Sequence, residues 1–458
     1  MTAQTILPAN TLSSGFNVDN SCRFNPPDAP YFAKDPTGDG NQRTFTISVW
    51  LKRSSTSGNQ TIVSGNSSNN KIHFLGSNNT LDIVQWSGSY QYRLRTSRVF
   101  RDTSAWYHLV IAVDTTLNTA DNRVRLYVNG VEETSFADRN NPSQNFATSW
   151  NDSEANFICK EGDNYFDGSM SHFHFCDGTA LAPTVFGSTD STTGEWKINT
   201  SPSFTLGNNG FTILKDGNTI TDQSSNSNNF TLGGGTLTKT EDNPSNNFPT
   251  LMTYEAYGAN TLIDDRTNGN TVGRSTTSGY SNYFASMAAT SGKYYWEFKY
   301  LAGSANNINI GGGIRWADTL KGMGVDAYQT SAGAWIVSYD GQKFNTVGSK
   351  SSANFTNAQS NNDICHIAWN ATIGAWWFGV NGTWASSATD SEIAAGTVTN
   401  AVYSSLDTTR PYAPCCFDAH TTSNTHDFAF NFGNGYFATT AVASAGTNAS
   451  GIGIFEYD

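Results

Sequence analysis

Two short stretches far apart in the chain carry the same alternating pattern, and each is followed by the same tight-turn signal. The first is RLYVNGVEE at residues 125–133 and the second is WWFGVNGTW at residues 376–384. Alternation with a period of two is typical of a β-strand that buries one face. Asn-Gly suits the two-residue type I′ turn, which needs positive φ at both central positions. The sequence therefore predicts two β-hairpins.

The alternation also predicts which side chains of each hairpin reach a core. In the first strand the buried phase holds Val124, Leu126 and Val128. In the second strand it holds Trp376, Phe378 and Val380, which leaves Ala375, Trp377 and Gly379 on the opposite face. The preceding stretches YHLVIAVD and CHIAWN match as well, and only the loops between strand and hairpin differ in length, where insertions are tolerated. We interpret the pattern as one architecture used twice.

Composition extends this reading to the whole chain of 458 residues. Aromatic residues make up 13% and charged residues only 14%, with 42 glycines. Disordered chains lack aromatic residues and carry dense charge, so this composition is not typical of them. No long window shows a helical period, and many short strands separated by turns indicate a sandwich or a barrel. The predicted fold class is all-β.

Two parts of the chain resemble known families. FTISVWLKR, SAWYHLVIAVDTT, RVRLYVNGVEE and YFDGSMSHFHFCDGTALAPTVFG resemble the laminin-G/concanavalin-A-like lectin family over residues 20–187. SGKYYWEFKY, GAWIVSYDGQKF, DICHIAWNATIGAWWFGVNGTW and RPYAPCCFDAHTTSNTHDFAFNFGNGYF resemble a SPRY domain over residues 276–440. The resemblance implies two concanavalin-A-like β-sandwiches, laminin-G-like and then SPRY-like. We place them at residues 1–187, including an N-terminal arm, and 276–458, including a C-terminal tail, joined by a β-rich connecting segment at 188–275.

The order of these parts also resembles a group of proteins of tailed bacteriophages, especially marine ones. The matching stretches are FGSTDSTTGEW, SSNSNNFT and DNPSNNFPTL. Members of that group are mostly tail-fibre or other virion structural proteins. The resemblance implies a virion protein that is made in the host cytoplasm.

The charge and the apolar segments of the sequence limit the classes of partner and the cellular location that we expect. The net charge is −12, and no run of Lys or Arg could neutralise a phosphate backbone, so we expect no nucleic-acid binding. The start, MTAQTILPANTLSSG, has no basic region followed by an apolar one, so no signal peptide is expected. No apolar stretch approaches the roughly 20 residues of a membrane span. The six cysteines form no C-x-x-C pair, and most are predicted to be reduced, buried thiols.

Catalytic patterns are absent from the sequence. Glycoside hydrolysis normally uses two carboxylates, yet RVRLYV and WWFGV contain no acid, and Glu297 in YYWEFKY is isolated. We assign Glu297 a solvent-facing role in solubility. No G-x-S-x-G elbow or phosphate loop occurs either. The chain is predicted not to be an enzyme, and no cofactor is expected.

Two groups of residues are weak candidates for metal ligands. In SHFHFCDG, His172, His174 and Cys176 would share one face of a regular strand and could bind zinc. The alternative is that Phe173 and Phe175 face the core while the histidines lie on a solvated or interdomain face.

The second group is a calcium candidate. Laminin-G-like units can hold calcium at the rim of the sandwich, and EGDNYFDG offers Asp163 and Asp167 there. Asp167 belongs to the F-D-G turn, where capping of the local backbone is the alternative role.

Ligand recognition is the remaining class of site. Five residues of the SPRY-like part are candidate ligand contacts. Trp377 lies out of phase with the buried residues of its strand and Trp384 follows the turn, while Trp335, Tyr339 and Asp340 are expected near the loops at one end of the sandwich. The alternative is that the tryptophans are core residues or pack against a neighbouring subunit.

These observations lead to a functional hypothesis. We expect a non-enzymatic virion protein, a tail fibre or head appendage, that adheres to a host-surface glycan or protein and contacts other virion proteins. Symmetric assembly is the rule for such particles, so a homo-oligomer is expected. Competing hypotheses are a purely structural capsid decoration or fibre-shaft protein, a glycan hydrolase and a bacterial adhesin.

Overall fold

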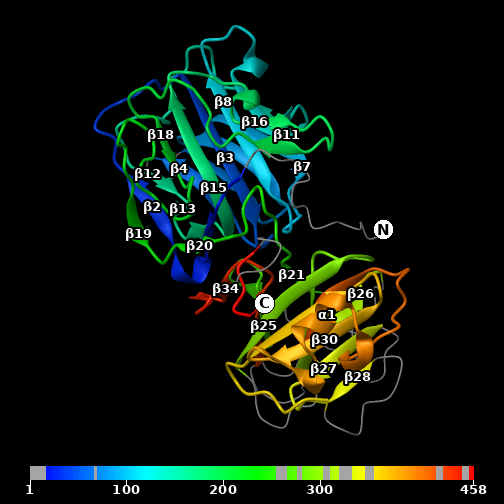
Figure 1. The fold of residues 1–458 in the computed structure, drawn as a ribbon. Helices are drawn as coiled ribbons and strands as arrows, with labels where there is room; N and C mark the ends of the chain where they lie inside the picture. Colours follow the sequence, from blue (N-terminus) through cyan, green and yellow to red (C-terminus); the bar gives the residue numbers. More distant parts are fainter. Residues whose placement is uncertain are drawn as a thin grey trace. The chain divides into compact units, whose positions relative to one another are not determined.

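The computed structural model describes residues 17–65, 70–253, 266–275, 281–302, 310–318, 333–345, 355–418, 426–445 and 453–457. The chain forms two compact units (Figure 1): an N-terminal unit, Asn10–Asn247, and a C-terminal unit that includes Phe248–Asp458. The N-terminal arm that the sequence suggested lies outside the described residues. Each unit is described by itself below.

Two eight-stranded antiparallel sheets build the N-terminal unit. The first has the order β10-β9-β8-β3-β15-β1-β20, with β18 also paired to β15, and the second has the order β11-β7-β6-β5-β4-β12-β2-β19. The strands of the first sheet are β1 (Ser21–Phe24), β3 (Thr44–Arg53), β8 (Tyr107–Asp114), β9 (Val124–Val128), β10 (Val131–Glu132), β15 (Gly168–Asp177), β18 (Phe211–Ile213) and β20 (Thr238–Thr240). Those of the second are β2 (Tyr31–Lys34), β4 (Gln60–Gly65), β5 (Asn70–Phe74), β6 (Thr80–Trp86), β7 (Tyr90–Val99), β11 (Phe136–Asn140), β12 (Asn156–Ile158) and β19 (Thr231–Gly234).

The core of the N-terminal unit lies between these two sheets. Phe45 and Ile47 of β3 belong to the same buried cluster as Ile83 of β6, so the inner faces of the sheets pack on each other. Side chains of opposite phase, such as Thr46 and Ser48, lie on the other face of β3 and outside this cluster, as strand alternation requires. The unit is therefore a β-sandwich.

Shorter elements complete this unit. Two small ribbons pair β13 (Lys160–Glu161) with β14 (Asn164–Tyr165) and β16 (Gly187–Thr189) with β17 (Trp196–Ile198). Three 3₁₀ turns are η1 (Pro26–Asp28), η2 (Ala120–Asn122) and η3 (Pro183–Val185).

The expected connecting segment, 188–275, is divided between the two units. Up to Asn247 it belongs to the N-terminal unit, where β18 and β20 join the first sheet and β19 joins the second. From Phe248 it belongs to the C-terminal unit. Its short strands pair with strands of the two sheets, because an isolated short strand is not stable by itself.

Two further antiparallel sheets build the C-terminal unit. Their orders are β21-β24-β32-β26-β27-β28 and β22-β23-β33-β25-β29-β30-β31. The strands of the six-stranded sheet are β21 (Leu251–Thr253), β24 (Ser281–Ala285), β26 (Ile310–Trp316), β27 (Ala334–Ser338), β28 (Lys343–Asn345) and β32 (Tyr412–Asp418). Those of the seven-stranded sheet are β22 (Arg266–Thr267), β23 (Val272–Ser275), β25 (Lys293–Ala302), β29 (Ile364–Asn370), β30 (Ala375–Val380), β31 (Thr383–Trp384) and β33 (His426–Asn431).

The C-terminal unit is also a sandwich. Phe298 of β25 and Phe378 of β30 share one buried cluster with Ile314 of β26, which comes from the other sheet. A small ribbon pairs β34 (Tyr436–Phe437) with β35 (Thr440–Ala441). The short helices are η4 (Ala385–Ser387), η5 (Val398–Asn400) and α1 (Asp390–Ala395), the one α-helix of the described residues. The all-β class and the two sandwiches predicted from the sequence are confirmed.

Both predicted hairpins are present, with the predicted buried phase. Val124, Leu126 and Val128 lie in the core of the N-terminal unit, and Trp376 and Phe378 lie in the core of the C-terminal unit. The turns join β9 to β10 and β30 to β31, and each has two central residues with positive φ: 48° and 78° at Asn129-Gly130, 49° and 76° at Asn381-Gly382. These are the signs of φ that a type I′ turn requires.

The F-D-G stretch depends on a close approach between strands. Gly168 begins β15 with a φ of 152°, and a Cβ at this position would collide with the carbonyl oxygen of Lys52 on β3. The preceding Phe166 is fully buried in the core. Glycine is therefore required where β15 meets β3.

Two further expectations concern cysteines and membrane spans. All six cysteines are buried and free, as predicted. No helix in the described part of the chain is both long and apolar enough to span a bilayer.

Candidate functional site

The structure places three of the five predicted ligand contacts in the core of the C-terminal unit. Trp335 on β27 packs against Trp316, with ring centroids 5.3 Å apart, and Tyr339 packs edge-on against Tyr300 at 4.9 Å. The exposed fraction of Trp377 is 1%, although it lies out of phase with the inner face of β30. These three residues offer no surface to a ligand in this structure.

The other two predicted contacts are partly exposed but serve the local structure. Asp340 accepts hydrogen bonds from the Ser338 hydroxyl and from Nε2 of Gln342, which closes the turn between β27 and β28. Trp384 donates its indole N–H to Asp390 at 2.7 Å and covers the buried ring of His366. The structure does not bring the five residues together into one site.

The zinc candidates are buried rather than exposed. A bulge in β15 between Ser171 and His174 gives His172 a φ of 48°, so His172, His174 and Cys176 do not follow regular alternation. His172 Nδ1 bonds to Ser171 Oγ at 2.8 Å and His174 Nδ1 bonds to Thr212 Oγ1 at 2.9 Å. Burial lowers the pKa of His172 to about 3 and that of His174 well below its usual value, so both rings are neutral at pH 7.

The alternative expected for these histidines, with the phenylalanines in the core and the histidines on a solvated or interdomain face, is correct only in part. Phe173 and Phe175 face the core as that alternative required. The opposite face is not solvated, because Phe186 and Phe204 pack on His174 and Cys176 lies in a cluster with Val110 of β8. Within the described residues, no three His, Cys, Asp or Glu side chains form a group that could hold a metal ion.

The calcium candidates lie close in sequence but do not form an oxygen cage. Asp163 is exposed in the turn between β13 and β14, and Asp167 is half-buried before β15. The carbonyl oxygen of Asp167 accepts the backbone N–H of Ser54 at 2.9 Å. This residue therefore helps to join β15 to β3 in the first sheet.

A buried serine–histidine pair invites a catalytic interpretation. Ser48 Oγ lies 2.9 Å from His108 Nε2, and Trp196 donates its indole N–H to His108 Nδ1 at 3.0 Å. Because Nδ1 accepts, the ring proton is on Nε2, which donates to Ser48. The imidazole therefore cannot take a proton from the serine. His108 is also fully buried, and burial lowers its pKa to about 3.

An exposed aromatic pair on the N-terminal unit is the clearest candidate for a ligand surface. Trp86 ends β6 and Tyr90 begins β7, and the exposed fraction of each residue is 44%. Their ring centroids are 4.8 Å apart and the rings are nearly perpendicular, at 77°. Trp86 is the one exposed tryptophan of the twelve in the chain, all of which the structure describes. Large exposed aromatic residues on a folded domain commonly mark binding sites.

The hairpin that carries this pair is held rigidly. The Arg93 guanidinium lies 4.7 Å from the centre of the Tyr90 ring and donates to the Tyr90 hydroxyl at 3.1 Å. It also forms a bidentate ion pair with Asp82 at 2.8–3.0 Å. Burial alone would raise the pKa of Asp82, but hydrogen bonds from His73 and Arg93 hold this pKa below its usual value. The aromatic surface is therefore preorganised, which lowers the entropic cost of binding.

Sequence reasoning missed Trp86 and Tyr90, although a signal was present. The stretch QWSGSYQY places one aromatic residue on each side of a Ser-Gly-Ser turn. Side chains beside a hairpin turn extend past the end of the sheet, so a core covers them less well than mid-strand residues.

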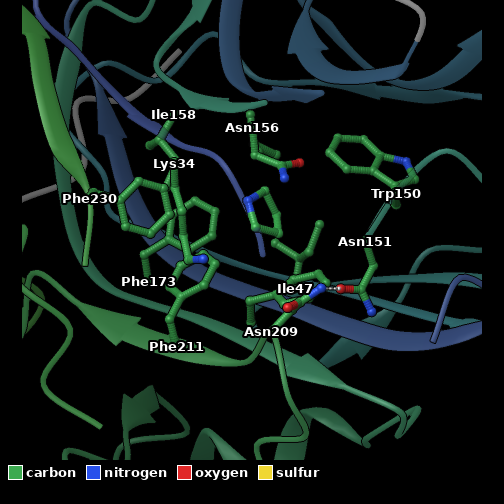
Figure 2. Close-up of a pocket in the computed structure, with 13 residues that line it drawn as sticks. Lys34, Ile47, Trp150, Asn151, Asn156, Ile158, Phe173, Asn209, Phe211 and Phe230 are labelled. Atoms are coloured by element: carbon green, nitrogen blue, oxygen red, sulfur yellow. Dashed lines mark hydrogen bonds between the residues drawn. The ribbon is translucent and has the colours of Figure 1, made fainter. Parts of the chain in front are cut away.

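Among the cavities lined by described residues, two in the N-terminal unit are relevant here. Figure 2 shows the first, between the sheets, where Lys34 lies among Ile158, Phe173 and Phe230, and where Asn209 donates to Asn151 at 2.9 Å. Its volume is about 30 Å³, enough for about two water molecules but not for a sugar ring. The second is a polar cavity of about 260 Å³ on the outer face of the first sheet, beside His174.

Comparison with known proteins agrees with this architecture. Residues 30–186 match the model of a family described as the concanavalin A-like lectin/glucanases superfamily. This part lies within the N-terminal unit and agrees with the lectin-like resemblance of its sequence. A comparison with curated protein sequences gives no match.

Similar solved structures include the following three. The SPRY domain of human HERC1 is 14% identical, with a TM-score of 0.28 over 35% of this chain and 87% of that domain. A putative carbohydrate binding protein from Bacteroides ovatus is 15% identical, with a TM-score of 0.34 over 49% of this chain and 61% of that one. A heptameric SAP-like pentraxin from Limulus polyphemus is 15% identical, with a TM-score of 0.29 over 44% and 97%.

Proposed function

We propose that this chain is a non-enzymatic adhesion protein of a phage virion, a tail fibre or head appendage that binds a glycan on the host surface. The observation that carries the binding role is the exposed pair Trp86 and Tyr90, held rigid by Arg93. An aromatic face can cover the apolar face of a sugar ring, while the indole N–H of Trp86, which has no hydrogen-bond partner among the described residues, can bind a hydroxyl.

The lectin-type family match over residues 30–186 supports a sugar as ligand, and the resemblance to phage proteins supports the virion setting. A single shallow surface of this kind binds weakly. Several copies on one particle would raise the avidity by about 10²- to 10⁴-fold where the geometry allows simultaneous contact.

Two observations support the absence of catalysis. Ser48 is not activated by His108, because the histidine donates to it. Glu297 is fully buried and accepts four hydrogen bonds, so it is not placed to protonate a glycosidic oxygen.

The test is a glycan array probed with the whole chain, followed by titration of the best glycan. We expect Trp86→Ala to weaken binding at least tenfold, equivalent to about 1.4 kcal/mol. Val131→Ser, which changes another exposed apolar residue of the same unit, should bind as the wild type does. Equal binding by Trp86→Ala and wild type would refute the role of the aromatic pair.

The purely structural hypothesis predicts a different result. Trp, Tyr and Arg are also the residues that dominate protein interfaces, so Trp86, Tyr90 and Arg93 could pack against a neighbouring virion subunit. In that case no glycan on the array binds, and Trp86→Ala lowers the amount of this protein in purified particles.

A further inference from the structure

The polar cavity of the N-terminal unit is separate from the aromatic pair. It lies on the outer face of the first sheet, where β15 and β18 are covered by the chain between β17 and β18. Its volume of about 260 Å³ is just below the roughly 300 Å³ at which pockets for drug-sized ligands begin. It is lined by His174, Ser201, Pro202, Phe204, Leu206, Thr212, Lys215, Gln223 and Ser224.

His174 is the most buried polar residue that lines this cavity. Its exposed fraction is 3%, and its ring is fixed by the hydrogen bond to Thr212 and by contacts with Phe186 and Phe204 at 5.6 and 5.7 Å between ring centroids. Thr212 is held in turn, since its backbone N–H donates to Asp222 at 2.9 Å. Nε2 of His174 has no partner among the described residues. Either tautomer leaves this atom one hydrogen bond to give or to accept.

The cavity wall carries one cation and no acid. Lys215 is half-buried, and its ammonium forms no ion pair within the described part of the chain. Its charge acts on both imidazoles, since it helps to lower the pKa of His172 and of His174. Behind the wall, Asp222 accepts hydrogen bonds from Thr212, Ser224 and Asn228 and is therefore already compensated. Asp216, which follows Lys215 in the sequence, is exposed and does not line the cavity.

The remaining polar groups of the wall add donors. The side-chain oxygen of Gln223 accepts the backbone N–H of Lys215 at 2.9 Å, which leaves its NH₂ group available to a ligand. The hydroxyl of Ser201 is at the exposed rim, and the half-buried ring of Phe204 is an apolar surface beside these groups. The wall therefore suits a ligand that is anionic, rich in hydroxyls and partly apolar on one face.

We propose that this cavity binds a small hydroxylated carboxylate of the hexuronate class. The carboxylate pairs with Lys215, the hydroxyls bond to His174 and Gln223, and the ring lies against Phe204. This site is independent of the aromatic pair and does not depend on the proposed adhesion to a glycan through Trp86.

The test is titration of the whole chain with galacturonate, galactose and acetate by calorimetry or ligand-observed NMR. We expect galacturonate to bind with a dissociation constant of about 1 mM, as a ligand of this size allows. Galactose, which lacks the charge, and acetate, which lacks the hydroxyls, should each bind at least tenfold more weakly. Equal binding of acetate would overturn the assignment of a sugar acid, and equal binding of galactose would overturn the role of the charge.

Three variants test whether galacturonate binds in this cavity. Lys215→Met removes the ion pair and should weaken galacturonate binding at least tenfold, since hydrogen bonds to charged groups are the strong ones. Ser201→Trp, at the exposed rim, should block entry without disturbing the core. Lys239→Met, an exposed lysine of the same unit outside the cavity, should bind as the wild type does.

Two further results decide against the proposal: no binding of galacturonate to the wild type, or unchanged binding by both Lys215→Met and Ser201→Trp. Trp86→Ala should retain galacturonate binding, because the two sites share no residue. Loss of galacturonate binding in Trp86→Ala would instead assign this ligand to the aromatic pair and overturn the cavity as its site.

Discussion

Glu297 shows how far the role of one residue can depend on a distant segment. It lies on β25 with no exposed surface, and its carboxyl group accepts hydrogen bonds from Asn431, from the Tyr295 hydroxyl and from the backbone N–H groups of Glu456 and Tyr457. Burial raises its pKa to about 7, although these donors oppose the rise. The solvent-facing role expected from the sequence is wrong, because the C-terminal residues cover this part of the sheet.

The residue-scale prediction is the effect of Glu297→Ala. The variant leaves two backbone N–H groups and one amide of Asn431 without an acceptor, so we expect the free energy of unfolding of the C-terminal unit to fall by about 3 kcal/mol or more. Hydrogen exchange at Glu456 and Tyr457 should become much faster, because their amides lose their acceptor.

Glu392→Ala is the matched control for this prediction, as it changes an acid of the same unit that caps α1 at the surface. It should cost about 1 kcal/mol and leave exchange at Glu456 and Tyr457 unchanged. Slow exchange at these two amides in Glu297→Ala would show that the carboxyl group does not hold the C-terminal residues.

At the scale of the element, the two Asn-Gly hairpins share more than a turn type. Oδ1 of Asn129 accepts the backbone N–H of His108 at 2.7 Å, and Oδ1 of Asn381 accepts that of Ile364 at 2.9 Å. The N–H of each asparagine donates to the carbonyl of the same partner, at 2.9 and 2.8 Å. Each asparagine therefore ties its turn to the start of the neighbouring strand, β8 or β29.

Because the geometry is the same, substitutions should cost the same in both units. We expect Asn129→Ala and Asn381→Ala each to lower the free energy of unfolding by about 2 kcal/mol, from the lost hydrogen bond to the neighbouring strand and the strain of positive φ. Asn381 also donates from Nδ2 to Asp363 at 2.8 Å, but this bond is exposed to solvent and its loss adds little. Asn→Gly at the same positions should cost only about 1 kcal/mol, since glycine adopts positive φ freely. Urea unfolding of each unit measures this loss of free energy. A loss in only one of the two hairpins would contradict the inference that both asparagines have the same structural role.

At the scale of the whole molecule, the two units should respond differently to acid. The N-terminal unit contains three buried neutral histidines, His108, His172 and His174, whose pKa values are lowered by burial. In the C-terminal unit, burial lowers the pKa of His366 to about 4, but Glu297 has a raised pKa and acts in the opposite direction.

The direction in which stability changes with pH follows from the pKa values of each group in the folded and unfolded states. A histidine with a lowered folded pKa contributes full stability above its unfolded value of about 6.5, and this contribution is lost as the pH falls. At pH 5 the loss is about 2 kcal/mol for each histidine, or roughly 6 kcal/mol for the N-terminal unit. A group with a raised folded pKa, such as Glu297, instead loses its contribution as the pH rises towards 7. On acidification, the contribution that Glu297 regains therefore offsets the loss from His366.

Buried thiols allow both units to be followed in one sample. Cys159 and Cys176 report on the N-terminal unit, and Cys365 and Cys416 report on the C-terminal unit. We expect the urea midpoint for labelling by a pyridyl disulfide to fall strongly between pH 7.5 and pH 5.0 for the first pair, and much less for the second. Equal shifts of both pairs would contradict the prediction.

The sequence by itself determined the local structure of this protein. Alternation in RLYV and WWFGV and the Asn-Gly dipeptides act over a few residues, so the strands, their inner faces and the type I′ turns could be predicted. Six scattered cysteines likewise predicted free, buried thiols.

Only the tertiary structure decided which outer faces are covered. His174 is covered by Phe186 and Phe204, and Glu297 by residues near the C-terminal end, although both side chains point away from the inner face of a sheet. Trp86 is exposed because no segment among the described residues packs over the end of its hairpin. Alternation tells the two faces of a strand apart, but whether a face meets water depends on segments distant in sequence, and that information is not local.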